Sequence, residues 1–494
     1  MELFLDAVQS FFEPTTVLLS LVGVFLGIVL GAIPGLSGGT AITVLLPFTY
    51  AMEPMLAMAI LVGIYVGGES GGYISAVLLG IPGTTSNVAT CYDGYAMTKK
   101  GEATKALSIA TISSFLGTFP SILVAMIACP VIAKFAVKMG PWEYFGLCFM
   151  AIMLVISLSK ENFLKGFIGA ALGLFLTQIG NAPVSGTPRF TFGTYRLAGG
   201  FNILTVLIGL FAGSIIVLSY AKGTSGLSDT YTGKIERFSF PGKELIYNVF
   251  NIIRSFVVGI FIGFLPGMGP ALSNVVSYGM AKSSSKHPEE FGKGCPDGVF
   301  APEVANNAAV GGALIPMISL GIPGDGITVL LLSALTIHGF ALGPLFQKTQ
   351  PRLVYLIFVA AMVGAIFTLF VEIIGIRLLP KILSIKCHFL YPAILLISMM
   401  GVYANATNIF TLYCVVFFTL LGVWLTYAEI PFTPFILSYV LGGILETNFR
   451  NAISYAGGDW LSFFKRPVSC ILILIAIFFA VYPFIRDYFS KKKA

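Results

Sequence analysis

Acidic residues occur inside apolar stretches of this sequence, close to places where the backbone is expected to be interrupted. Asp325 directly follows a Gly-Ile-Pro-Gly string at 321–324, and Glu303 shares the string at 301–308 with Asn306 and Asn307. Carboxylates within a membrane are costly and mark ion pathways. A structural role, in which these side chains bond neighbouring helix ends, is the alternative. The pattern predicts a site for a coupling cation, which can be Na⁺ with a proton as the open alternative, formed by Gly80, Gly83, Asn87, Glu303, Asn306, Asn307, Gly321, Gly324, Asp325 and Thr328.

Four more acidic residues lie in apolar surroundings. Glu69, like Glu303, comes shortly before a Gly-Gly pair. Glu372 and Glu429 are expected at interfaces, and Glu446 is given no role. The sequence therefore offers Glu303 and Asp325 as the carboxylates for ion coupling.

Small polar residues follow each interruption. A half-helix that begins within a membrane presents unpaired N–H groups and about half a positive charge, which suits a carboxylate or phosphate. Hydroxyl and amide side chains at the same place can bind the solute, or can cap the half-helices. No Lys or Arg lies between Gly31 and Gly94 or between Ser255 and Ala281. The predicted substrate-binding residues are Ser37, Gly38, Gly39, Thr40, Thr84, Thr85, Ser86, Gly269, Ser273 and Asn274.

The interruptions themselves are Gly–Pro–Gly clusters. They lie at 31–35, 80–83, 263–270 and 321–324. Pro lacks the N–H group that a helix needs, and Gly tolerates a positive φ angle, so together they end a helix. Non-helical backbone at membrane depth persists only where protein buries it or where it lines a wet cavity. The clusters therefore predict broken helices or re-entrant hairpins.

The breaks form two series in the same order, which predicts an internal duplication. Each series runs from a GxxPG break through a Gly-Gly pair, at 71–72 or 311–312, to a GIPG break. The distance from the pair to the GIPG break differs by one residue between the copies. We expect two repeat halves, 1–235 and 236–494, with a longer loop near 282–299 in the second.

Loop charges indicate that the repeats are inverted. The connection at 48–54 carries no Lys or Arg, whereas its counterpart carries Lys282, Lys286 and Lys293. Basic loops favour the cytoplasmic side of a membrane. The two connections are therefore expected on opposite sides.

Composition places the chain in a membrane. Hydrophobic residues make up 56% of the 494 and charged residues 10%, against about 25% charged in soluble domains. A span needs about 20 apolar residues, and the runs predict an all-α integral membrane protein with about ten to fourteen crossings. The candidate spans are 17–33, 55–67, 106–119, 121–137, 144–158, 166–180, 201–220, 246–265, 300–318, 327–340, 353–375, 389–402, 408–427, 432–445 and 467–485.

Several functional classes lose support. The cysteines include no CxxC string, the three histidines lie far apart, and no GxxxxGK[ST] string for ATP is present. No patterning for nucleic acid is evident, and no cofactor is expected. Paired broken helices are typical of secondary transporters. A membrane-embedded enzyme and a channel are the alternatives.

Two strings carry a resemblance to a known family. They are Pro-Gly-Met-Gly-Pro at 266–270 and Ala-Pro-Glu-Val-Ala-Asn-Asn-Ala at 301–308. With the wider stretches Gly31–Pro47, Tyr65–Gly94 and Gly263–Gly339, they resemble the large membrane subunit of the tripartite tricarboxylate transporter family. The general layout is similar along the whole chain.

The resemblance implies a multi-pass permease of the bacterial inner membrane. Its partners would be a small four-helix membrane subunit, a periplasmic solute-binding protein and the membrane lipid. Its substrates would be carboxylates, from tricarboxylates and dicarboxylates to aromatic acids, taken up by symport with an ion, commonly sodium. Whether the complex forms a homodimer, and which carboxylate it carries, are left open.

Overall fold

The computed structural model describes residues 2–157, 163–221, 233–340, 343–383 and 387–491. In these residues the regular secondary structure is helical apart from one short antiparallel pair, β1 (Gly180–Asn181) and β2 (Pro188–Arg189). The all-α prediction is confirmed. The chain forms two compact units, of which the first comprises Met1–Ala133 and Ile215–Asn405 and the second Lys134–Ser214 and Ala406–Ala494. The proposed halves 1–235 and 236–494 concern a repeat rather than these units, and they stay a prediction.

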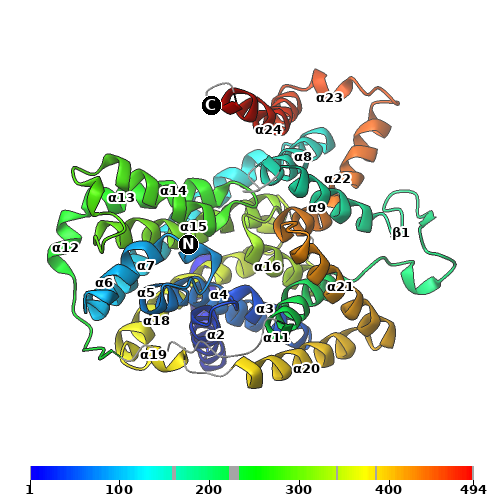
Figure 1. Cartoon of the computed structure of the whole chain (residues 1–494). Helices are drawn as coiled ribbons and strands as arrows, with labels where there is room; N and C mark the ends of the chain where they lie inside the picture. The colour runs from blue at the N-terminus through cyan, green and yellow to red at the C-terminus, as the bar shows by residue number, and fades with distance from the viewer. Residues whose placement is uncertain (1, 158–162, 222–232, 341–342, 384–386, 492–494) are drawn as a thin grey trace. The chain divides into compact units, whose positions relative to one another are not determined.

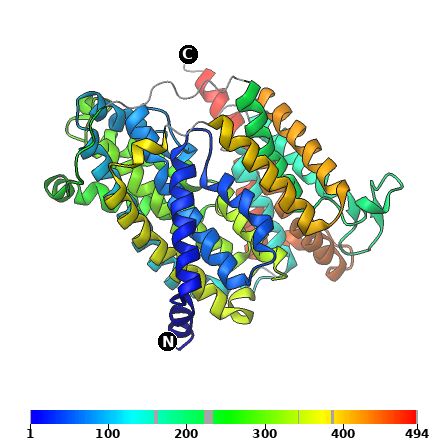
Figure 2. The same ribbon diagram turned by 90° about the horizontal axis from the view of Figure 1, so that it is seen from below.

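The first unit contains both series of helix breaks. In Figure 2 its first two helices follow one another in dark blue from the N-terminus. Its helices are α1 (Glu2–Phe11), α2 (Pro14–Ala32), α3 (Gly38–Thr49), α4 (Pro54–Gly71), α5 (Tyr73–Leu79), η1 (Thr85–Asn87), α6 (Thr90–Lys99), most of α7 (Ala103–Ala136), most of α11 (Ser214–Ala221), α12 (Gly242–Tyr247), α13 (Val249–Phe264), α14 (Gly269–Ser284), η4 (Pro288–Glu290), α15 (Asp297–Leu320), α16 (Gly326–Ile337), α17 (Phe346–Thr349), α18 (Pro351–Gly375), α19 (Leu379–Ile382) and α20 (Cys387–Ala406).

The same three-helix arrangement occurs twice in this unit. α2 packs along α4 with α3 against both, and α13 packs along α15 with α14 against both. Figure 1 shows α13, α14 and α15 side by side. Pro14 and Pro54 at the first helical positions of α2 and α4 provide a preset φ where no N–H partner is needed. The connection between α14 and α15 is longer than that between α3 and α4, as predicted.

Close backbone contacts repeat as well. A methyl group on Gly27 or Gly31 would meet the carbonyl oxygen of Ile64 or Gly68 in α4. A methyl group on Gly259 would meet the carbonyl oxygen of Ala305 in α15, and one on Gly263 would meet the carbonyl oxygen of Ala309. Small residues thus let each helix pair approach closely, as in membrane helix interfaces.

These contacts also correct the alignment of the two copies by one residue. Gly71 packs on the backbone of Ile28, and Gly312 packs on that of Ile260 in the same way. Gly71 therefore corresponds to Gly312 and not to Gly311. With this alignment the distance to the GIPG break is the same in both copies.

Within the described residues, six helical stretches are long and apolar enough to cross a membrane, and shorter apolar helices accompany them. The number of crossings stays a prediction. The candidate spans 106–119 and 121–137 are wrong as separate elements, because α7 runs through both as one helix of 34 residues with Pro120 and Pro130 inside it. The long stretches are Pro14–Ala32, Pro54–Leu79, Ala103–Ala136, Ile203–Ala221, Pro351–Gly375 and Ile409–Tyr427.

The second unit is a smaller helical bundle. α22 packs against α8 and α9, α8 also packs against α24, and α21 packs against α10 and η3. Phe145, Phe449 and Phe463 form an aromatic cluster between α8, α22 and α23. The elements of this unit beyond β1 and β2 are α8 (Pro141–Ser157), α9 (Phe163–Thr177), η2 (Tyr195–Leu197), α10 (Ile203–Leu207), η3 (Ile208–Gly213), α21 (Ile409–Tyr427), α22 (Phe432–Tyr455), α23 (Ser462–Lys465) and α24 (Pro467–Lys491).

Candidate functional site

Each predicted break ends one helix and starts another. After the first break, Ser37 caps α3 by accepting a hydrogen bond of 3.2 Å from the backbone N–H of Thr40. At the GIPG breaks, Gly80 ends α5 with φ +69° and Gly321 ends α15 with φ +71°. Both angles lie in the left-handed region that glycine adopts without strain. The sequence prediction of four interruptions is confirmed.

Asp325 caps α16 with its side chain. Its Oδ1 accepts a hydrogen bond of 2.6 Å from the Thr328 N–H. In return, the Thr328 hydroxyl oxygen accepts a hydrogen bond from the Asp325 N–H. This is a capping box. Its Oδ2 accepts a bond of 2.5 Å from the Tyr65 hydroxyl on α4. Asp325 thus fixes the half-helix start and ties it to the first repeat.

Glu303 is the centre of a second network between the repeats. Its Oε1 accepts hydrogen bonds from Asn87 Nδ2, at 2.9 Å, and from the Thr90 hydroxyl. Asn274 on α14 donates to the same hydroxyl oxygen, and its own Oδ1 accepts from the Ala89 N–H at 2.8 Å. A carboxylate in the middle of the second copy is therefore surrounded by groups from the first copy's break.

The network continues to Glu69 through hydroxyl groups. Ser86 donates a hydrogen bond of 2.6 Å to Glu69 Oε2, and the Ser86 and Thr84 hydroxyls lie 2.6 Å apart. Thr84 also donates to Asn87 Oδ1 at 2.6 Å. The chain of contacts thus joins Glu69, on α4, to Glu303, on α15, through the residues that follow the first GIPG string.

The half-helix starts of different repeats lie beside one another. α3 packs against α16, and a methyl group on Gly39 would lie 3.6 Å from the side chains of Ile327 and Leu330. η1 packs against α14, where Asn274 makes its contacts. The exchange is reciprocal, since each GxxPG half-helix meets the segment after the other copy's GIPG break. The four breaks thus gather in one region of the first unit.

Some buried polar atoms in this region have no hydrogen-bond partner. They are Glu303 Oε2 and both side-chain atoms of Asn306. Both side chains are 0% exposed. Because an unpartnered buried polar group carries a desolvation cost of about 1–3 kcal/mol, such atoms are candidates for ligand contact.

Other predicted site residues have structural contacts or lie apart. The Ser273 hydroxyl donates to the backbone oxygens of Pro270 and Ala305. Asn307 accepts hydrogen bonds from Ser70 on α4 and Thr118 on α7. Thr85 is exposed. Gly83 lies against Gly31 and Gly72, and Gly324 lies against Ala313 and Gly263. Gly38 lies against Gly68, and Gly269 lies against Asp325. The site assignment as a whole stays a prediction.

Sequence reasoning missed Tyr65, Thr90 and Asp93. Tyr65 and Thr90 donate to the two carboxylates described above. Neither differs in type or surroundings from an ordinary helix residue, and only the approach of the two repeats places them in contact. The Gly-rich string in which Tyr65 lies was the one available indication.

Asp93 holds the longer loop of the second repeat. Its carboxylate, 0% exposed, accepts hydrogen bonds from the N–H groups of Gly292, Gly294 and Cys295 at 2.8–3.0 Å. The Tyr278 hydroxyl adds a fourth donor at 2.9 Å. One side chain of α6 thus supplies the hydrogen-bond acceptor for the part of this loop that follows η4.

Two other acidic residues have different surroundings. Glu429 is exposed and pairs with Lys165. The Glu372 side chain is 0% exposed and lies among residues of α4, α7 and α18. The expectation that both lie at interfaces stays a prediction.

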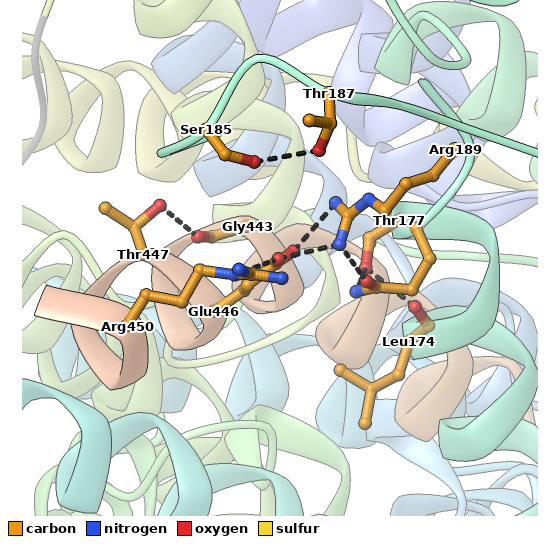
Figure 3. Close-up of polar contacts among 10 residues, drawn as sticks. Leu174, Thr177, Ser185, Thr187, Arg189, Gly443, Glu446, Thr447 and Arg450 are labelled. Carbon is orange, nitrogen blue, oxygen red and sulfur yellow. Dashed lines mark hydrogen bonds and ion pairs between the residues drawn. The ribbon is translucent and has the colours of Figure 1, made fainter. Parts of the chain in front are cut away.

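The second unit contains a separate charged cluster (Figure 3). Arg189, on β2, makes two parallel hydrogen bonds of 2.7 and 3.0 Å to the carboxylate of Glu446 on α22. It also donates to Gln178, and Arg450 donates to Glu446 at 2.7 Å. The bidentate geometry orients both groups. This cluster attaches the β1–β2 hairpin to α22.

Apolar helices with paired internal breaks, and polar side chains gathered at those breaks, define a membrane transporter. The chain matches the tripartite tricarboxylate transporter TctA family over residues 17–437 and belongs to that family. The protein is therefore a transporter component and not an enzyme. Members of this family act in a three-component transporter with a binding protein and a small subunit.

Two relatives come from Agrobacterium vitis. An uncharacterized 52.8 kDa protein in the TAR-I ttuC′ 3′ region is 33% identical over 484 residues, which cover 97% of this chain and 96% of the relative. An uncharacterized protein in the TAR-II ttuC′ 3′ region is 34% identical over 232 residues, 46% of this chain and 96% of that protein. No solved structure matches the chain.

Proposed function

We propose that this protein is the permease subunit of a sodium-coupled secondary transporter that takes up a small carboxylate, such as a tricarboxylate or a dicarboxylate. The observation that carries the proposal is the gathering of all four breaks, with the buried carboxylates Glu303 and Asp325, in one region of the first unit. Alternating access then consists of rearrangement of the two repeats around this region.

The substrate is bound by backbone rather than by basic side chains. A buried carboxylate needs compensation, since an unpaired charge within a membrane is costly. No Lys or Arg lies in either stretch that forms the GxxPG half-helices. The N–H groups at the starts of α3 and α14, with Ser37, Thr40 and Thr84, are the donors that we assign to it.

The coupling cation is bound in the same region by the acidic and amide side chains of the second repeat. Asn306 and Glu303 Oε2 supply the unpartnered oxygens, and Asp325 supplies a carboxylate at the second GIPG break. Among the described residues there is no group of three or more His, Cys, Asp and Glu side chains that could hold a metal ion. Hydroxyl, amide and carbonyl oxygens suit Na⁺, a hard cation, better than a transition metal.

The partners follow from the family. We assign a small four-helix membrane subunit and a periplasmic solute-binding protein, with the complex in the bacterial inner membrane. The binding protein captures the carboxylate and delivers it to the outward-open permease.

Reconstituted uptake tests the proposal. Proteoliposomes that contain both membrane subunits, with the binding protein added outside, should accumulate labelled citrate or succinate when an inward Na⁺ gradient is imposed. A K⁺ gradient of equal size is the control. Counterflow of labelled solute is expected from a carrier and not from a channel. Accumulation that needs ATP, or that is indifferent to Na⁺ at every pH, would contradict it.

A further inference from the structure

A polar pocket lies in the first unit, and none of the residues predicted for the substrate or the cation lines it. Helices α4, α7 and α18 line it, and its polar residues are Ser70, Thr111, Ser114, Thr118, Thr368 and Glu372. No basic residue lines it. In this conformation the pocket has no room for a free water molecule.

Two side chains on α18 expose unpartnered oxygens to this pocket. Glu372 and Thr368 lie one helical turn apart and are 0% and 3% exposed. Neither carboxylate oxygen of Glu372 has a hydrogen-bond partner, and neither does the Thr368 hydroxyl. Three buried oxygens on one helix face therefore lack compensation.

The opposing hydroxyl groups are oriented by Asn307. Ser70 and Thr118 donate to Asn307 Oδ1 at 3.1 and 3.0 Å, while Asn307 Nδ2 donates to Ser114 at 3.1 Å. The hydrogens of Ser70 and Thr118 are thus engaged away from the pocket. Their oxygen lone pairs stay available to an occupant of the pocket.

The oxygen set is that of a cation site. A carboxylate, three or more hydroxyl oxygens and no nitrogen ligand suit a hard cation. A proton would neutralise Glu372 without supplying a ligand to the hydroxyl oxygens, and the binding experiment below separates a proton from a metal cation. A metal cation that contacts Glu372 and Thr368 compensates all three at once.

We infer that Glu372 and Thr368, with the hydroxyl oxygens of Ser70 and Thr118, bind a second Na⁺ ion. This inference rests on the proposed sodium coupling and adds an ion to it. Asn307 links the pocket to the break region, because its amide also donates to the backbone oxygen of Glu303 at 3.0 Å. Binding at α18 thus acts on the helix that carries Glu303.

Ionisable neighbours of Glu372 are few. Glu303, on α15, lies near enough to interact with its charge, and the Tyr73 hydroxyl, on α5, lies near enough to interact with the carboxylate as a distant donor. The Tyr73 hydroxyl also lies 2.7 Å from that of Thr111, and either of the two can be the donor. A cation in the pocket therefore screens Glu372 from Glu303 as well as neutralising it.

Sodium binding to the purified membrane complex tests the inference directly. Radioactive Na⁺ bound per protein, and the Na⁺ dependence of uptake, are measured for the parent, Glu372→Gln and Thr368→Val. Both substitutions preserve side-chain volume. Ser438→Ala is the control, since Ser438 is also buried and unpartnered but lies on α22 in the other unit.

The expected loss is about one Na⁺ per protein in both variants, with the Hill coefficient for Na⁺ falling to about one. The control should match the parent. If Glu372→Gln binds as much Na⁺ as the parent, or changes only the pH dependence of uptake, the second site is refuted. If the parent itself binds Na⁺ but transports without it, the proposed coupling fails while the binding data still decide on the site.

Discussion

The Tyr65 hydroxyl group donates a hydrogen bond of 2.5 Å to Asp325 Oδ2, and this bond joins α4 of the first repeat to the break before α16 of the second. The same carboxylate caps α16 through Thr328. Oδ1 therefore contacts the half-helix α16, and Oδ2 contacts α4 of the other repeat. A cation bound at Asp325 would therefore act directly on a contact that joins the two repeats.

Replacement of Asp325 by Asn should weaken the Na⁺ dependence of uptake. Asn retains an oxygen that can cap α16, so the protein should still insert, but it lacks the charge that compensates a cation. The Na⁺ concentration for half-maximal uptake should rise at least about tenfold, the equivalent of about 1.4 kcal/mol of lost binding free energy. Uptake by cells with matched membrane expression measures it.

Tyr65→Phe is the matched control for that experiment. It removes the hydrogen bond to Asp325 and leaves the charge. We expect a smaller effect on Na⁺ activation than that of Asp325→Asn. Normal Na⁺ activation in Asp325→Asn would remove this residue from the ion site.

The sequence predicted the breaks but not what they contact. Gly and Pro act through local backbone geometry. The Gly–Pro–Gly clusters alone therefore predict where α2, α5, α13 and α15 end. The partners of Glu303 are separated from it by more than 200 residues, and Asn87 and Thr90 reach it only because the repeats interlock. Pro120 and Pro130 are the opposite case. Proline usually ends or kinks a helix, but α7 continues through both residues.

Opposite labelling of two loops is expected if the repeats are inverted. Single cysteines placed in the 48–54 connection and in the 283–286 segment, in a background without native cysteines, should react with an impermeant maleimide from opposite sides of the membrane. Intact cells and inside-out vesicles give the two arms of the measurement. Labelling of both positions from one side would rule out the inversion.

Cys295 should label slowly at neutral pH. It lies in the loop held by Asp93, and burial raises the pKa of its thiol to about 11. Since the thiolate is the reactive form, its fraction grows about tenfold per pH unit below that pKa. The rate of maleimide reaction at Cys295 should therefore rise steeply between about pH 7 and 9. Asp93→Asn, which replaces one acceptor oxygen by a donor group, should loosen the loop and increase the rate at constant pH.

The Arg189–Glu446 pair should stabilise the second unit. Lys in place of Arg189 can form one of the two parallel bonds but not both. We expect Arg189→Lys to lower the free energy of unfolding by about 1 kcal/mol or more, because the pair is largely buried. Arg450→Lys is the control, since Arg450 is 43% exposed and donates a single bond. Thermal unfolding in detergent compares the two, and equal effects would contradict the bidentate argument.

The last prediction concerns the substrate. If backbone N–H groups bind the carboxylate, bulk at the half-helix starts should block uptake more than loss of a hydroxyl. Gly38→Val and Gly269→Val should abolish uptake. Ser37→Ala should lose about tenfold, the equivalent of about 1.4 kcal/mol, which is at the upper end for one neutral hydrogen bond.

The structure sharpens this test, because both valines would also disturb packing. A methyl group on Gly38 would lie 3.1 Å from Gly68 Cα, and one on Gly269 would lie 2.5 Å from Asp325 Cβ. Gly39→Ala avoids the difficulty, since its methyl group meets neighbours no closer than 3.4 Å. We expect Gly39→Ala to keep the parent's unfolding temperature and to lose at least as much uptake as Ser37→Ala. Gly279→Ala, at an exposed position of α14 with nothing within 4 Å, should transport like the parent. Parental uptake by Gly39→Ala would mean that the solute does not approach the start of α3.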